Sequence, residues 1–220
     1  MTARLCLGLL AATIVVGSAA AAAGDPERRD IRPADQAWAA RATLHPSDLP
    51  SSFTAIRVGS KQKGGPLRCP GFQPDLSDLT ITGEAVSPVF QNQATGMTIY
   101  AGAEVYKSVR DEREAWRRTA RREALRCVAG ELRRGSLAGV SVKVTRRFMR
   151  VPPRVGERAI SGRIVASVVV QGLTIPVWID LLGVARGRAD ATLIVSAVRL
   201  APPAALEGRL LAALDRRLKR

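Results

Sequence analysis

The chain has 220 residues, 46% hydrophobic and 24% charged, so it is long enough to bury the core of one ordinary domain. Its formal net charge of +15, carried by 29 arginines and 5 lysines, favours anionic partners. One histidine, His45, and three cysteines exclude a His-rich metal site and a four-cysteine zinc site. The composition also excludes a disordered chain, a collagen and a multi-pass membrane protein.

The first residues have the organisation of a secretory signal peptide. Arg4 provides a positive start, Leu5–Val16 is an uncharged apolar run, and 17–23 is a tail of small residues. We expect cleavage between Ala23 and Gly24, and therefore a secreted protein of the cell envelope. The alternative is an uncleaved anchor, which the short apolar run disfavours because a membrane-spanning helix needs roughly 20 residues.

Two cysteines, Cys69 and Cys127, follow the predicted cleavage site. Outside the cytoplasm an even number of cysteines usually forms disulfides, and two cysteines allow one connectivity. We therefore predict a Cys69–Cys127 bridge, with a pair of buried free thiols as the alternative. Closing a loop of this length stabilises a fold by about 4 kcal/mol in the chain-entropy account.

Hydrophobic periodicity predicts an α+β fold. After a mobile N-terminal linker and short helix over 24–42, residues 43–220 are expected to form a single domain, with one long helix after Ser108 and another after Pro202. The predicted strands are Phe53–Val58, Leu79–Phe90, Met97–Tyr106, Val140–Met149, Arg158–Val170, Leu173–Ala185 and Ala189–Val198. Tight turns favour antiparallel pairing into a sheet of about seven strands, with the helices packed on it.

The helix that Ser108 caps carries the clearest candidate for a binding surface. Five arginines recur at helical spacing and would present an array of planar donors on one side: Arg113, Arg117, Arg118, Arg121 and Arg122. Such an array suits the phosphate or carboxylate groups of an anionic lipid, wall polymer or glycan. The alternative is a solvated face, partly neutralised by glutamates of the same helix. Nucleic acid fits the charge, but export and the lack of a readout motif argue against it.

Little in the sequence points to catalysis. No nucleophile elbow, phosphate-binding loop or zinc-protease motif occurs, and His45 precedes a proline in a turn. A hydrolase using paired carboxylates is the weaker alternative, and its candidate residues are Asp75, Asp78, Glu84 and Asp180. We therefore expect a non-enzymatic protein that uses no cofactor and no metal.

The last helix carries a leucine stripe, formed by Leu206, Leu210, Leu214 and Leu218. Two interpretations are open. The stripe packs on the protein's own sheet, or it lies on an anionic membrane surface with basic side chains opposite.

Several segments together resemble one family. They are Ser47–Pro50, Cys69–Phe72, Asp75–Gly83, a tryptophan-bearing helix that ends near Cys127, and a late hairpin over Asp180–Arg188. With the signal peptide, they resemble small exported actinobacterial proteins. That group is similar to the extracellular sensor domain of mycobacterial receptor Ser/Thr kinases and to related PsbP-like lipoproteins. The resemblance begins at about Leu44, and it departs from the kinase domains in having one cysteine pair where they have two bridges.

The resemblance implies a PsbP-like α/β sandwich that binds or senses a ligand without catalysis, and it supplies no catalytic residues. We therefore expect a secreted cell-envelope module that takes an anionic or amphipathic ligand between its sheet and a helix. The alternative is a structural or protein-interaction component of an envelope complex.

Overall fold

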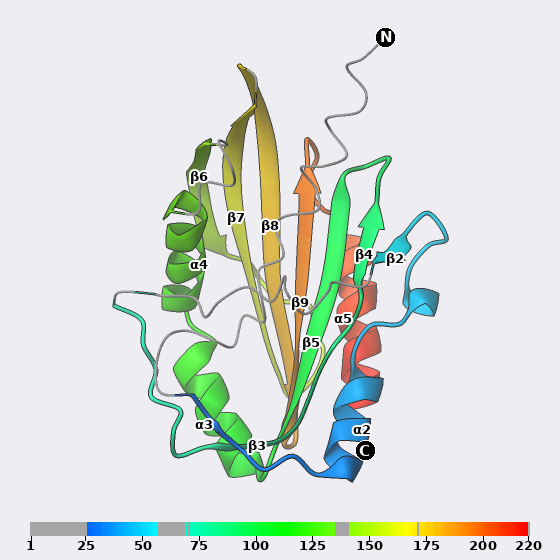
Figure 1. Cartoon of the computed structure of the whole chain (residues 1–220), viewed down its shortest axis with the longest axis vertical. Helices are drawn as coiled ribbons and strands as arrows, with labels where there is room; N and C mark the ends of the chain where they lie inside the picture. Colours follow the sequence, from blue (N-terminus) through cyan, green and yellow to red (C-terminus); the bar gives the residue numbers. More distant parts are fainter. Residues whose placement is uncertain (1–25, 57–68, 70, 135–140, 171, 220) are drawn as a thin grey trace.

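The computed structural model describes residues 26–56, 69, 71–134, 141–170 and 172–219 (Figure 1). The predicted signal peptide and its cleavage site between Ala23 and Gly24 lie outside the described residues. Among the helices that are described, none is both long and apolar enough to cross a membrane.

The described chain is an α+β fold built on one nine-stranded sheet. Its strands are β1 (Arg28–Arg29), β2 (Thr54–Ile56), β3 (Thr80–Val86), β4 (Val89–Asn92), β5 (Met97–Tyr106), β6 (Ser141–Met149), β7 (Arg158–Val170), β8 (Leu173–Arg186) and β9 (Ala189–Val198). The main path runs β1-β3-β5-β9-β8-β7-β6, and β2 joins through β4, which pairs with β5. The pairings are antiparallel except for β1 with β3. The α+β class is as predicted.

The strand count exceeds the predicted seven for two reasons. The single strand expected over Leu79–Phe90 is two strands, β3 and β4, which pair with successive parts of β5 on either side of Pro88. Proline has no N–H to donate to a ladder, so the break falls there. The second addition is β1, which lies in the predicted mobile linker over 24–42, where the N–H of Arg28 donates to the carbonyl of Leu79 at 2.9 Å. The described part of this segment therefore belongs to the domain.

Helices cover both faces of the sheet (Figure 1). They are α2 (Pro33–Ala42), α3 (Val109–Thr119), α4 (Arg122–Arg134) and α5 (Ala204–Leu218), with a short 3₁₀ turn, η1 (Pro46–Asp48). Helices α2 and α5 lie over the face that carries Ile99, Leu182 and Leu193, and α4 lies over the face that carries Ile164 and Ile179. Helix α3 continues the second layer, where Trp116 packs against Gly183.

The leucine stripe of α5 is buried in the core between that helix, α2 and the sheet, with Leu210 and Leu214 almost fully enclosed. The interpretation that it packs on the protein's own sheet is confirmed. This burial follows from the hydrophobic effect, since four leucines on one side of a helix gain most by covering an apolar sheet face.

Arg188, in the turn between β8 and β9, connects that turn to α2. Its guanidinium donates to both carboxylate oxygens of Asp35, at 3.0 and 2.5 Å, and to the carbonyl oxygen of Tyr106 at 2.7 Å. It also lies 5.1 Å from the ring centroid of Trp38. Close packing at Gly83 brings α2 near the sheet, because any Cβ there would collide with the backbone carbonyl of Asp35.

The predicted disulfide between Cys69 and Cys127 is present. The two Cα atoms are 5.2 Å apart, an ordinary separation for a bridge, and both cysteines are buried. The bridge links α4 to the chain that leads into Leu76, whose side chain is buried beside α3.

The helix expected after Ser108 is divided into α3 and α4. Ser108 caps α3 as predicted, and its hydroxyl accepts from the Asp111 N–H at 3.1 Å. The division follows from the directions in which the buried side chains point. Helix α3 buries Glu112 and Ala115, whereas α4 buries residues around Val128. In one continuous helix of 3.6 residues per turn these two sets would point about a third of a turn apart. The break at Ala120 lets both sets face the sheet.

Two carboxylates lie directly opposite each other on adjacent antiparallel strands, Glu104 on β5 and Asp190 on β9. Burial, together with the nearby charge of Glu27, raises the pKa of Glu104 to about 7. Burial and the charge of Glu104 raise the pKa of Asp190 above its usual range. The hydroxyl of Tyr106 donates to Glu104 at 2.9 Å, which opposes part of this shift. The pair therefore takes up protons on folding.

We expect Glu104→Gln to reduce the pH dependence of stability. Since the folded-state pKa lies above the ordinary value of about 4.3, the folded protein holds a proton that the unfolded chain has lost between these values. The free energy of unfolding therefore falls as the pH rises through this range. Calorimetric Tm values from pH 5 to 8 should fall less in the variant than in the wild type. Glu131→Gln, which removes a surface partner of Arg134 on α4, is the control and should leave the slope unchanged. Equal slopes for Glu104→Gln and the wild type would show that Glu104 is ionised throughout.

Candidate functional site

The five arginines predicted as an anion-binding array lie on both sides of the break between the helices. Arg113, Arg117 and Arg118 belong to α3, Arg121 lies in the break, and Arg122 begins α4. They are therefore not one continuous side of a single helix.

Three of these arginines are already engaged. Arg117 pairs with Glu114 at 2.7 Å, and Arg118 donates to the Asp78 carboxylate at 3.0 Å. The Nε of Arg121 donates to the Arg117 carbonyl at 2.6 Å. Arg113 is exposed, and the side chain of Arg122 is 72% exposed. Of the predicted set, Arg113 and Arg122 are therefore the least constrained.

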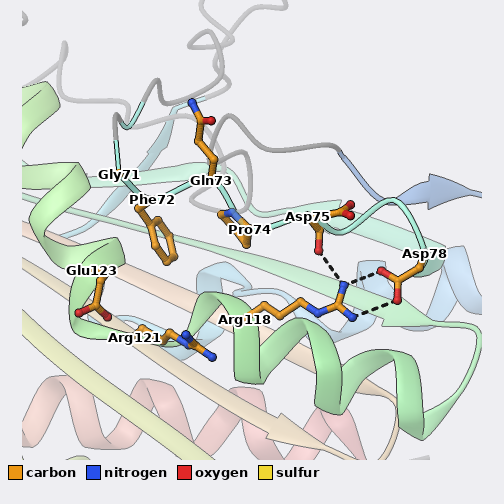
Figure 2. Close-up of a pocket in the computed structure, with 9 residues that line it drawn as sticks. All are labelled: Gly71, Phe72, Gln73, Pro74, Asp75, Asp78, Arg118, Arg121 and Glu123. Atoms are coloured by element: carbon orange, nitrogen blue, oxygen red, sulfur yellow. Dashed lines mark hydrogen bonds and ion pairs between the residues drawn. The ribbon is translucent and has the colours of Figure 1, made fainter.

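One pocket lies where the chain Gly71–Asp78 passes the junction of α3 and α4 (Figure 2). Its volume is about 710 Å³, and it contains Arg118 and Arg121 of the predicted set. We call it the loop pocket. Figure 2 shows the Arg118 side chain extending toward Asp75 and Asp78. The hydrogen bond from Arg118 lowers the pKa of Asp78, and hydrogen bonds from Ser77 lower the pKa of Asp75.

The loop pocket is poorly suited to an anion. Its described lining contains two arginines but three carboxylates, those of Asp75, Asp78 and Glu123. The guanidinium of Arg118 donates hydrogen bonds to the Asp78 carboxylate and to the Asp75 carbonyl, so it contributes little positive potential to a ligand in this pocket.

A second pocket lies between α4 and strand β6, and we call it the arginine groove. Its volume is about 740 Å³, within the range of about 300–1,000 Å³ typical of ligand sites. The residues that line it are Arg122, Leu125, Arg126, Val144, Thr145, Arg146, Arg147, Phe148 and Met149.

The polar part of the groove consists of four arginines and Thr145, with no carboxylate among the described lining residues. The guanidinium nitrogens of Arg122 and Arg126 lie 4.0 and 3.9 Å from a carboxylate oxygen of the neighbouring Glu123, and both distances are too long for a hydrogen bond. The guanidinium of Arg146 lies 5.7 Å from the ring centroid of Phe148. Donors for an incoming anion are therefore available here, in contrast to the loop pocket.

The apolar part of the groove comes from how β6 meets α4. Strand β6 is the last strand of the sheet path, and its register shifts between Val144 and Arg146. Met149 pairs with Gly162, which has no side chain, and an added Cβ there would lie 3.0 Å from Leu125. Met149 stays 41% exposed on this face, whereas Phe148 pairs with Arg163 and points to the opposite face of the sheet. The groove therefore offers exposed apolar carbon next to guanidinium groups.

Sequence reasoning identified one groove arginine, Arg122, and missed Arg126, Arg146 and Arg147. A signal for the missed residues exists. Arg126 follows Arg122 by four positions, and two adjacent arginines interrupt the alternation of the predicted strand Val140–Met149. Neither signal shows that the helix and the strand lie side by side.

The other chemical candidates have structural partners. Asp180 is fully buried and accepts from the Arg163 guanidinium at 2.6 and 2.5 Å, and Glu84 pairs with Arg29 at 3.2 Å. His45 precedes η1, with its ring 3.4 Å from the Arg41 carbonyl. The four carboxylates proposed for a hydrolase are thus held by different partners: Ser77 for Asp75, Arg118 for Asp78, Arg29 for Glu84 and Arg163 for Asp180.

Comparison with models of known protein families and with proteins of curated function finds no match to this chain.

Proposed function

We propose that this protein is an exported, non-enzymatic binding module that holds an anionic amphipathic ligand in the arginine groove. The observation that carries the proposal is the contrast between the two pockets. The loop pocket has more carboxylates than arginines, whereas the described lining of the arginine groove has four arginines and no carboxylate.

The proposed ligand follows from the two kinds of surface in the groove. A guanidinium binds phosphate or carboxylate oxygens through parallel hydrogen bonds, and Arg122, Arg126 and Arg147 would supply these donors. Leu125, together with Val144 and the exposed side chain of Met149, would cover an alkyl chain. A single-chain amphiphile with an anionic head uses both surfaces.

The proposed location outside the cytoplasm rests on the disulfide and the signal-like N-terminus. A buried Cys69–Cys127 bridge is typical of extracytoplasmic proteins. Cell-envelope lipids and lipid-linked polymers there supply ligands of the required chemistry. The PsbP-like sandwich and the sensor role belong to the same proposal.

Charge reversal in the groove tests the proposal. We expect Arg126→Glu/Arg147→Glu to weaken the binding of dodecyl phosphate by about tenfold or more, because two charge-assisted contacts become repulsive. Isothermal titration below the micelle concentration measures the affinity. Dodecyl maltoside, which has the same tail and a neutral head, should bind weakly to both proteins.

Arg117→Glu/Arg121→Glu is the matched control, because it changes the net charge equally at arginines outside the groove. It should bind dodecyl phosphate as the wild type does. Equal losses in both variants would mean that overall charge, and not the groove, determines the affinity. If the wild type fails to bind dodecyl phosphate, the alternative role in an envelope complex gains support.

A further inference from the structure

The β7–β8 hairpin projects beyond the rest of the sheet. Strand β8 begins at Leu173, but its pairing with β9 begins only at Val177, opposite Val198. Figure 1 shows the end of this hairpin at one extreme of the long axis, beyond both α4 and α5. No described helix or strand therefore covers its last residues on the β9 side.

The projecting end is apolar and uncharged. Residues 164–179 contain no charged side chain in a chain that is 24% charged. Val169 and Leu173 are exposed, the latter by 66%. Leu200 lies near the hairpin, because the N–H of the preceding residue, Arg199, donates to the Pro176 carbonyl at 2.9 Å. Its side chain is 79% exposed. We call Val169, Leu173 and Leu200 the apolar tip.

The chain beside the tip is held in a costly conformation. Arg199 has a φ of 73°, in the left-handed region that side chains other than glycine rarely adopt. Arg199 adopts this conformation although it is not a glycine, and the residue that follows it, Leu200, is exposed. A conformation that costs energy and exposes apolar carbon is typical of functional surfaces.

Basic side chains flank the tip. Ser141 of β6 pairs with Val169, which places exposed Lys143 close behind the tip, and exposed Arg199 lies on its other side. The surroundings of the tip therefore complement a negatively charged surface.

We propose that the apolar tip docks on an anionic lipid bilayer, with Val169, Leu173 and Leu200 entering the interface and Lys143 and Arg199 meeting the headgroups. Exposed aliphatic side chains next to basic ones are the combination that interfacial anchors use. A second copy of this chain would also cover the apolar carbon, but two surfaces rich in positive charge repel each other. The site is distinct from the arginine groove, and its existence does not depend on the groove function.

Vesicle cosedimentation tests this proposal. The oxidised protein from Gly24 onward should sediment with phosphatidylglycerol–phosphatidylcholine vesicles, and much less with phosphatidylcholine alone or at high salt. Leu173→Asp should lower the vesicle partition coefficient about tenfold, because an exposed leucine no longer enters the interface. Its Tm should equal that of the wild type, since this side chain is exposed. Should Leu173→Asp disturb the fold, Leu200→Ser measures the same contact.

Val151→Asp is the matched control, since Val151 is 93% exposed and lies in the connection from β6 to β7, away from the tip. It should sediment like the wild type. Equal losses in Leu173→Asp and Val151→Asp would overturn the tip assignment in favour of general electrostatic attraction. Concentration-dependent self-association that Leu173→Asp abolishes, without vesicle binding, would assign the surface to a second copy. Either result leaves the dodecyl phosphate test of the groove unaffected.

Discussion

Arg188→Ala is expected to lower the free energy of unfolding by about 3 kcal/mol, because it leaves a buried carboxylate without its main cationic partner. Asp35 is almost fully buried, and Arg188 contacts both of its oxygens. The same guanidinium also donates to the Tyr106 carbonyl and lies against Trp38. Its loss would therefore loosen α2, the β8–β9 turn and β5 together. Urea unfolding followed by far-UV circular dichroism measures the change.

A double-mutant cycle with Asp35→Ala separates the ion pair from the other contacts of Arg188. The coupling energy should be about 2 kcal/mol, within the range of groups that share a buried network. Arg117→Ala, which removes an exposed ion pair with Glu114, should change stability by only about 0.5 kcal/mol. A loss for Arg188→Ala as small as that of Arg117→Ala would contradict the structural role assigned to Arg188.

Removing the disulfide is expected to have an effect of similar size. Cys69→Ser/Cys127→Ser should lower the free energy of unfolding by about 4 kcal/mol, because the bridge restricts the unfolded chain over a long loop. The sequence separation of the two cysteines is 58 residues. Guanidinium unfolding of the oxidised wild type and of the double variant measures the difference.

Reduction provides the control for this variant. Treating the wild type with dithiothreitol should reproduce the loss, whereas the same treatment should leave the double variant unchanged. Alkylation of Cys69 or Cys127 in unreduced, unfolded protein would show that the bridge does not form. If the free energy of unfolding of the wild type is the same with and without dithiothreitol, the bridge does not stabilise the fold.

Local patterns in the sequence predicted most of the described elements. Alternation in Met97–Tyr106 and the paired runs on either side of Gly172 predicted β5, β7 and β8, because the period of a strand is contained in a few neighbouring residues. The Ser108 cap was equally local. The pairing of Cys69 with Cys127 could be predicted by elimination alone.

The division of the long helix was not predicted. Both halves have helical periodicity, and only the requirement that Glu112 and Val128 face one sheet reveals the change of phase. The short strand β1 was missed for a related reason, since its pairing with β3 depends on a partner about 50 residues away.

The sequence by itself determined the strong positive charge, most of the strands and, once the predicted signal peptide is set aside, the Cys69–Cys127 pairing, because each depends on counting or on local periodicity. Only the tertiary structure decided which arginines are available to a ligand. Arg118 is neutralised by Asp78, 40 residues away, whereas Arg126 on a helix and Arg147 on a strand line the same groove. Electrostatic neutralisation depends on distance in space, and the fold brings together charges that the sequence keeps apart.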